Sequence, residues 1–153
     1  MSIQNEEKIW NLIDAKREAF IELADRVFDT PETLYKEFRS VKEHVSMLEA
    51  EGFRITQNVC GMPTAVIGEA GDEGPIIAIL GEFDALPGLA QSNSPFKEVV
   101  SNETGAGHAC GHHLFGAASA WAAVTIKEWL ENNNVAGTVR FYGTPAEIGR
   151  AHV

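Results

Sequence analysis

Residues 75–84 read Pro-Ile-Ile-Ala-Ile-Leu-Gly-Glu-Phe-Asp, and this stretch decides the fold class. The apolar run that follows Pro75 has no polar alternation, which is typical of a strand buried on both faces. Such a strand ends near Leu80, and Asp84 follows it beyond the carboxyl end. We therefore predict a buried strand over residues 75–80 with an acidic side chain just after it.

The residues downstream of this strand predict a helical crossover to a second strand. Residues 85–107 carry two prolines and three glycines, which indicate a long loop. Residues 114–130 are rich in alanine and have strong helix character, and residues 137–143 are typical of a strand. The order strand, loop, helix, strand implies a right-handed crossover and a mainly parallel sheet flanked by helices, so the predicted fold class is α/β.

Helical periodicity upstream predicts two helices before the sheet. Apolar residues from Ile3 to Val27 fall on one broad helical stripe, which is bounded by Thr30-Pro31. We expect Thr30 to cap a second helix that has Pro31 at its first position and runs to Gly52. Two further extended candidates, residues 53–59 and 64–67, precede the central strand.

The charge balance argues against nucleic acid and membrane as partners. Among 153 residues, 12 Lys and Arg stand against 22 Asp and Glu, a net charge of −10, which repels phosphate backbones and anionic lipid surfaces. No run approaches the roughly 20 apolar residues of a membrane-spanning helix, and nothing resembles a secretory signal. Only two cysteines occur, Cys60 and Cys110. A reduced cytoplasmic protein fits best, although the sequence also allows a single disulfide.

Three short polar segments follow the predicted strands and the loop. Asp84 follows the strand that ends at Leu80, Glu147 follows the strand that ends near Gly143, and residues 107–113 lead into the long helix. In open α/β sheets, ligands bind beyond the carboxyl ends of the strands. We therefore expect the three segments to converge on one rim.

Residues 107–113 read Gly-His-Ala-Cys-Gly-His-His and are the most specific local signal in the chain. Imidazole and thiolate are metal ligands, and a helix N-terminus favours an ionised Cys110. Cys-x-His supplies only two ligands, so a metal site also requires a carboxylate from elsewhere. The alternative is a glycine-rich helix entry with solvated His108 and His113 and a buried, inert Cys110.

Three segments carry a resemblance to a known family. Residues 81–89 (Gly-Glu-Phe-Asp-Ala-Leu-Pro-Gly-Leu), 107–113 and 143–147 (Gly-Thr-Pro-Ala-Glu) resemble, in order and spacing, three signatures of the M20 metallopeptidase and amidohydrolase family. The likeness is greatest to the branch that contains the aminobenzoyl-glutamate hydrolase subunit. It covers nearly everything from the first helix to Glu147.

The resemblance implies roles for four residues. Cys110 and His112 match the metal ligands of the family, Glu147 matches the general base, and Asp84 matches the aspartate that orients the site. His113 stands where most members of this branch have aspartate, and neither it nor His108 receives a role.

The resemblance also implies a reaction, a cofactor and partners. The reaction is metal-assisted hydrolysis of the amide bond of an N-acyl amino acid or short peptide, with an aminobenzoyl-glutamate-like compound as the small-molecule substrate. The cofactor is a divalent metal ion, zinc or manganese, with cobalt as a further option. The full-length protein is expected to form a homodimer or to assemble with a paralogous subunit.

The sequence departs from the family pattern directly after Glu147. The family places a second, metal-binding glutamate where this chain has Ile148, and an apolar side chain cannot bind a metal. Residues 148–153 are also the translation of the sequencing-adapter start AGATCGGAAGAGCACACGTC, read after its first two bases. We interpret residues 1–147 as the N-terminal part of a metallo-amidohydrolase catalytic domain and residues 148–153 as a non-native tail from adapter read-through.

This interpretation makes the chain a fragment that lacks the lid and dimerisation domain of the family. Alone, such a fragment is expected to bind metal weakly and to hydrolyse nothing. A second hypothesis stays open, in which the chain is a noncatalytic metal-binding or interaction module with the same fold.

Overall fold

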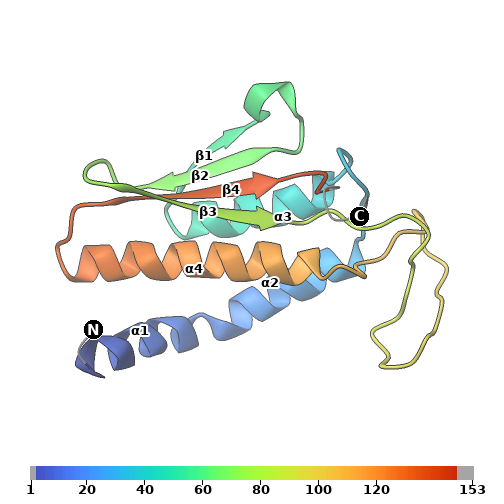
Figure 1. The fold of residues 1–153 in the computed structure, drawn as a ribbon, viewed down its shortest axis with the longest axis horizontal. Coiled ribbons are helices and arrows are strands. Elements are labelled where there is room, and N and C mark those ends of the chain that lie inside the picture. Colours follow the sequence, from blue (N-terminus) through green and yellow to red (C-terminus); the bar gives the residue numbers. More distant parts are fainter. Residues whose placement is uncertain (1–2, 148–153) are drawn as a thin grey trace.

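A four-stranded sheet covered by helices on one face forms the part of the chain that the structure describes. The computed structural model describes residues 3–147, so the six residues of the suspected tail lie outside it. Figure 1 shows α4 and α3 against the sheet, α2 packed beneath α4, and α1 continuing from α2. The elements are α1 (Ile3–Ala15), α2 (Arg17–Asp29), α3 (Phe38–Ala50), β1 (Arg54–Gln57), the 3-10 turn η1 (Val59–Gly61), β2 (Val66–Ala70), β3 (Ile76–Glu82), α4 (His112–Asn132) and β4 (Thr138–Thr144).

The α/β class is confirmed, but the expectation of a mainly parallel sheet is wrong for the described strands. Their order is β1-β2-β4-β3, and only β3 and β4 pair in parallel, through the crossover helix α4. β1 and β2 are antiparallel, as are β2 and β4. A parallel connection needs a crossover of a dozen or more residues, and the short link between β1 and β2 does not supply one.

The first predicted helix is interrupted, and residues 3–29 form α1 and α2 with a break at Lys16. The Lys16 ammonium lies 2.7 Å from a Glu51 carboxylate oxygen and 3.0 Å from one of Glu128. These ion pairs fasten the junction to the end of α3 and to α4. The apolar stripe continues across the break, so its periodicity could not reveal it.

Thr30 ends a helix and does not begin one, so the predicted cap is wrong. Its backbone N–H donates to the carbonyl of Val27, which closes α2. The next helix starts only at Phe38, because the Glu32 carboxylate accepts the backbone N–H of Arg39 and of Ser40, each at 2.9 Å. Residues 31–37 are therefore a loop, and Glu32 satisfies the free donors at the start of α3.

The prediction that the strand over residues 75–80 is buried on both faces is wrong, because β3 is largely exposed. The exposed fractions of Ile76, Ile77 and Leu80 are 54%, 40% and 63%. Within residues 3–147, β3 is an edge strand, and β4 is the strand whose alternate side chains, Val139 and Phe141, are fully buried. An apolar sequence makes burial of β3 favourable, but the elements that pack on the strand in the folded chain decide whether it is buried.

The hydrophobic core lies between the sheet and the helices. The rings of Phe20 in α2 and Trp121 in α4 stack with centroids 5.6 Å apart. No helix within residues 3–147 is both long and apolar enough to cross a bilayer. Fully buried apolar side chains come from both layers and include Leu23, Val27, Leu48, Phe83, Val124, Val139 and Phe141.

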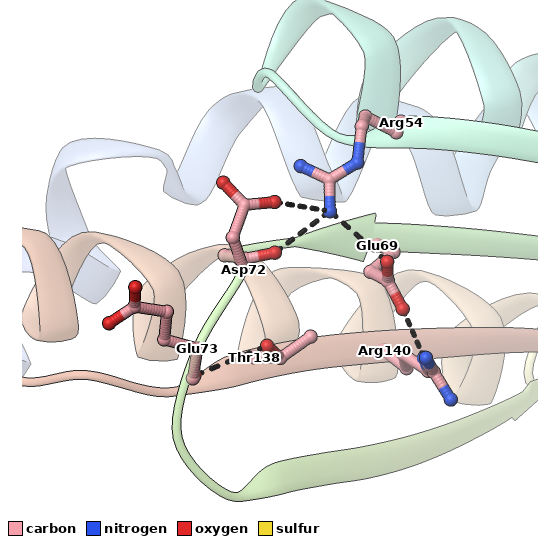
Figure 2. Close-up of polar contacts among 7 residues, drawn as sticks. Arg54, Glu69, Asp72, Glu73, Thr138 and Arg140 are labelled. Atoms are coloured by element: carbon pink, nitrogen blue, oxygen red, sulfur yellow. Dashed lines mark hydrogen bonds and ion pairs between the residues drawn. The ribbon is translucent and has the colours of Figure 1, made fainter.

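A row of charged side chains crosses three strands on the face away from the helices. In register, Arg54 of β1 pairs with Glu69 of β2, and Glu69 pairs with Arg140 of β4. Glu69 accepts a hydrogen bond from each arginine, and Arg54 also pairs with Asp72 at 3.1 Å, as Figure 2 shows. Opposite charges on directly facing residues support this register. The Arg140 guanidinium, together with that of Arg54, holds the pKa of Glu69 below its ordinary value.

Glu69→Gln is expected to lower the free energy of unfolding at pH 7 by about 0.5–1 kcal/mol, because partly exposed ion pairs are screened by water. A lowered pKa means that this contribution is complete above the ordinary glutamate range and is lost as the pH falls through the folded-state pKa. Urea unfolding should therefore show a deficit at neutral pH that shrinks below about pH 4. Glu131→Gln, which removes one exposed pair with Lys127, is the control. A deficit that does not change with pH would contradict the assignment.

Candidate active site

His112, the first residue of α4, is held by Asp84, which follows β3. The His112 Nδ1 lies 2.8 Å from a carboxylate oxygen of Asp84 and 3.0 Å from its carbonyl oxygen. Both neighbours are acceptors, so Nδ1 carries the proton, and the side chains are only 1% and 2% exposed. The hydrogen bond with Asp84 raises the pKa of the His112 imidazole.

The other ring nitrogen of His112 faces Glu147. The His112 Nε2 lies 3.8 Å from a Glu147 carboxylate oxygen. This nitrogen is buried and has no hydrogen-bond partner among the described residues. The Glu147 side chain remains 23% exposed. Asp84, His112 and Glu147 come from three separate segments, and the structure brings them together at one rim, as predicted.

The parallel pairing of β3 and β4 explains why Asp84 and Glu147 lie at the same edge of the sheet. Glu82 and Thr144, the last residues of these strands, are register partners, so both strands end at the same edge. The Thr144 hydroxyl also donates to the Gly81 carbonyl at 3.3 Å. Asp84 and Glu147 therefore leave the sheet side by side.

Two glycines allow α4 to begin close to this edge. A Cβ on Gly116 would lie 2.7 Å from the Glu82 carbonyl oxygen and 2.6 Å from a ring nitrogen of His44, so a larger residue would push the helix away. Gly111 precedes His112 with a φ of 78°, a conformation that glycine adopts without strain. His112 can therefore enter the site at the first position of the helix.

Cys110 is not brought into a metal-binding cluster. It is an exposed free cysteine, and residues 3–147 contain no group of three or more His, Cys, Asp or Glu side chains placed to hold a metal ion. The assignment of Cys110 as a ligand therefore stays a prediction. The alternative has a buried Cys110 and solvated His108 and His113. It is wrong for Cys110, which is exposed, and for His108, which is only 8% exposed, while His113 is half-buried.

His108 and His113 form a ring cluster with Phe28 beside the site. The ring centroids of His108 and His113 lie 4.9 Å apart, and those of Phe28 and His113 lie 5.1 Å apart. His108 Nε2 donates to the Val27 carbonyl at 3.1 Å. Burial, together with the nearby His113, lowers the pKa of His108 to about 4. His108 is therefore neutral at physiological pH and packs as an aromatic ring.

His112 has the arrangement expected of a metal ligand. In metal sites, a ligating histidine commonly donates its second N–H to a carboxylate, which fixes its tautomer and orientation. His112 makes this bond to Asp84, and its buried Nε2 lies near Glu147 without a hydrogen-bond partner among residues 3–147. Nitrogen and thiolate donors suit zinc, whereas carboxylate donors suit manganese. The chemistry of His112 fits a metal at Nε2, although residues 3–147 contain no group of three or more potential ligand side chains placed to hold one.

The sequence analysis missed one buried carboxylate close to the site, that of Glu37. It is 0% exposed and accepts hydrogen bonds from Thr64 and Ala146, which lie 27 and 109 residues away. Burial raises the pKa of this carboxyl, although its hydrogen bonds act in the opposite direction. No local pattern could have identified it, because its partners are distant in the sequence.

Comparisons with known proteins show that the chain is similar to hydrolases, deacetylases and peptidases. No family model matches the chain. It is 44% identical over 137 residues, 90% of its length and 28% of the relative, to a p-aminobenzoyl-glutamate hydrolase subunit of Escherichia coli. It is 34% identical over 139 residues, 82% of its length and 35% of the relative, to N-acetylcysteine deacetylase of Bacillus subtilis. The chain thus spans about a third or less of these relatives.

Solved structures agree with the sequence relatives. A dinuclear metal-binding peptidase of the M20 family from Bacillus subtilis superposes with a TM-score of 0.60 at 36% identity, over 85% of this chain and 36% of that one. Human carnosine dipeptidase 1 shares the fold, with a TM-score of 0.57 at 16% identity over 95% of this chain and 36% of that one. The chain belongs to the M20 peptidase family.

Proposed function

We propose that this chain carries part of the active site of a metal-dependent amidohydrolase that cleaves an N-acyl amino acid or a short peptide. The observation that carries the proposal is the buried His112, which is held by Asp84 on one ring nitrogen and faces Glu147 with the other. The names of the relatives support it, since they include a hydrolase, a deacetylase and a carboxypeptidase.

His112 Nε2 and the thiolate of Cys110 would hold the metal, together with ligands outside residues 3–147. Zinc and manganese are the favoured ions, with cobalt as a further option, and a relative in the family is named as a dinuclear metal-binding protein. The bound ion would polarise the amide carbonyl and lower the pKa of the attacking water. Asp84 orients the His112 ring and keeps Nδ1 as the protonated nitrogen.

Glu147 would act as the general base. Its partly exposed carboxylate lies close to His112 Nε2, so it can meet a water molecule that enters from solvent. It would accept a proton as the water oxygen attacks the amide carbon, and would then pass the proton to the leaving nitrogen as the C–N bond breaks. The products are a carboxylic acid and a free amine.

The choice of substrate and partner rests on the 44% identical relative, whose name specifies p-aminobenzoyl-glutamate and one subunit of a hydrolase. We therefore propose an aminobenzoyl-glutamate-like substrate, and assembly of the full-length protein with a paralogous subunit or as a homodimer. The 153-residue chain alone is proposed to bind metal weakly and to lack turnover.

Hydrolysis that depends on metal would test the proposal. Residues 1–147 are joined to the part of the Escherichia coli relative outside the matched 137 residues, and this extended chain is co-expressed with the companion chain of that hydrolase. We expect it to release glutamate from p-aminobenzoyl-glutamate, to lose activity on dialysis against a chelator, and to regain it with zinc, manganese or cobalt. Activity that persists after complete metal removal would contradict the proposal.

A noncatalytic metal-binding module is the second candidate. It rests on the same buried His112 held by Asp84, because metal binding by itself requires no general base. If both the 153-residue chain and the extended chain bind metal while neither shows turnover, the module is the better description. Turnover in the extended chain alone excludes it.

A further inference from the structure

Glu37 joins three segments that are distant in the sequence. It lies just before α3 and is completely buried. One of its carboxylate oxygens, Oε1, accepts the backbone N–H of Tyr35 at 2.9 Å and that of Ala146 at 3.0 Å. The other, Oε2, accepts the hydroxyl of Thr64 at 2.6 Å. A single side chain thus connects the loop before α3, the segment before β2 and the segment after β4.

The two backbone groups that share Oε1 both belong to residues with strained backbone conformations. Tyr35 and Ala146 each have a φ of 58°, in the left-handed region that residues other than glycine seldom adopt. Such conformations persist only where surrounding contacts hold them. The Glu37 carboxylate supplies such a contact to both residues at once.

Ala146 directly precedes Glu147, so its backbone sets the direction in which Glu147 leaves the sheet. Glu147 then reaches to 3.8 Å from His112 Nε2. The Asp84 side of the site depends on the loop of residues 31–37. The backbone N–H of Ala85, which follows Asp84, donates to the carbonyl of Glu32 in this loop at 2.7 Å. The loop of residues 31–37 therefore contacts both segments that place a carboxylate against His112.

We propose that Glu37 is a positioning residue, which holds Ala146 in its left-handed conformation and thereby directs Glu147 toward His112. The alternative is that Glu37 only stabilises the packing of the loop before α3 against Thr64. The expected effect of Glu37 on turnover rests on the proposed function, whereas its effect on the position of Glu147 can be measured in this chain alone. The two are therefore tested separately.

Positioning is tested by NMR on the isotope-labelled 153-residue chain. Glu37→Met keeps the length of the side chain but removes both acceptor oxygens. It should speed hydrogen exchange of the Ala146 amide by about tenfold or more and abolish the nuclear Overhauser effects between Glu147 and the His112 ring. Glu37→Gln keeps an acceptor oxygen and should preserve both signals.

Thr64→Val is the matched control, because it removes a bond to the same carboxylate and leaves the bond from Ala146 in place. It should leave the Ala146 exchange rate and the Glu147 signals unchanged, even where it lowers stability. If Glu37→Met does not fold, Glu37→Asp replaces it, since the shorter side chain withdraws the carboxylate from Ala146. Unchanged Glu147 signals in folded Glu37→Met or Glu37→Asp, or equal losses in Thr64→Val, would overturn the proposal.

The extended chain tests the catalytic consequence. Glu37→Met should lower kcat by about 10- to 100-fold with KM nearly unchanged, and Glu37→Gln should restore most of the rate. If the extended chain without any substitution shows no turnover, the proposed function is contradicted. The NMR test of the position of Glu147 is not affected by that result. An unchanged kcat in Glu37→Met, with an active parent, would count against positioning.

Discussion

His112→Ala is expected to weaken divalent-metal binding to the 153-residue chain by more than about 100-fold, because the change removes a ligand rather than one of its supporting contacts. Within residues 3–147, the buried Nε2 of His112 has no hydrogen-bond partner, while Asp84 holds its Nδ1. Isothermal titration with zinc and with manganese measures the loss. In the extended chain, the same substitution should abolish hydrolysis.

Three variants show whether this loss is specific. Asp84→Asn should weaken metal binding by about 10- to 100-fold, because the carboxylate that orients the ring is lost. His113→Ala removes the neighbouring ring that packs on Phe28 and should change the affinity little. Cys110→Ala separately tests the second proposed ligand. Unchanged metal stoichiometry and affinity in His112→Ala would exclude His112 as a ligand, and the same result in Cys110→Ala would exclude only Cys110.

Glu147→Gln in the extended chain should retain the metal and lose about 10²- to 10⁴-fold in kcat, the usual contribution of a general acid-base group. The amide has nearly the same shape as the carboxylate but cannot accept the proton that the attacking water must lose. Steady-state hydrolysis of p-aminobenzoyl-glutamate, with metal content measured on the same samples, provides the comparison.

The control for this change is Glu131→Gln, at the far end of α4, where Glu131 pairs with Lys127. It should leave kcat unchanged. A reduction of less than about threefold in Glu147→Gln would mean that this carboxylate is structural, since a general base contributes far more. A loss of metal together with activity would indicate instead that Glu147 belongs to the ligand shell.

The sequence by itself determined the type of most elements and the segments of the site. Apolar periodicity and turn residues predicted the helix that became α4 and the strands that became β3 and β4. The parallel pairing of β3 and β4 then followed from the helix between them, and it explains why Asp84 and Glu147 could be expected at one edge. These features depend on local patterns, which a sequence carries directly.

Tertiary contacts decided where elements begin and which faces are covered. The start of α3 depends on the Glu32 carboxylate, which is held against Arg39 and Ser40 by the fold of the loop. The apolar run of β3 is exposed because β3 is an edge strand of the described sheet and has a neighbouring strand on one side only. Local sequence propensity depends on neither the contact with Glu32 nor the position of β3 in the sheet, so it could predict neither feature.

Only the tertiary structure disclosed Glu37. In the sequence it is one glutamate among many, placed within a predicted helix. In the folded chain it is buried and bonded to Thr64 and Ala146. Taking a carboxylate out of water is unfavourable unless hydrogen bonds replace those of the solvent. Those bonds come from residues that approach one another only when the chain folds, and this is the physical reason that the sequence could not show them.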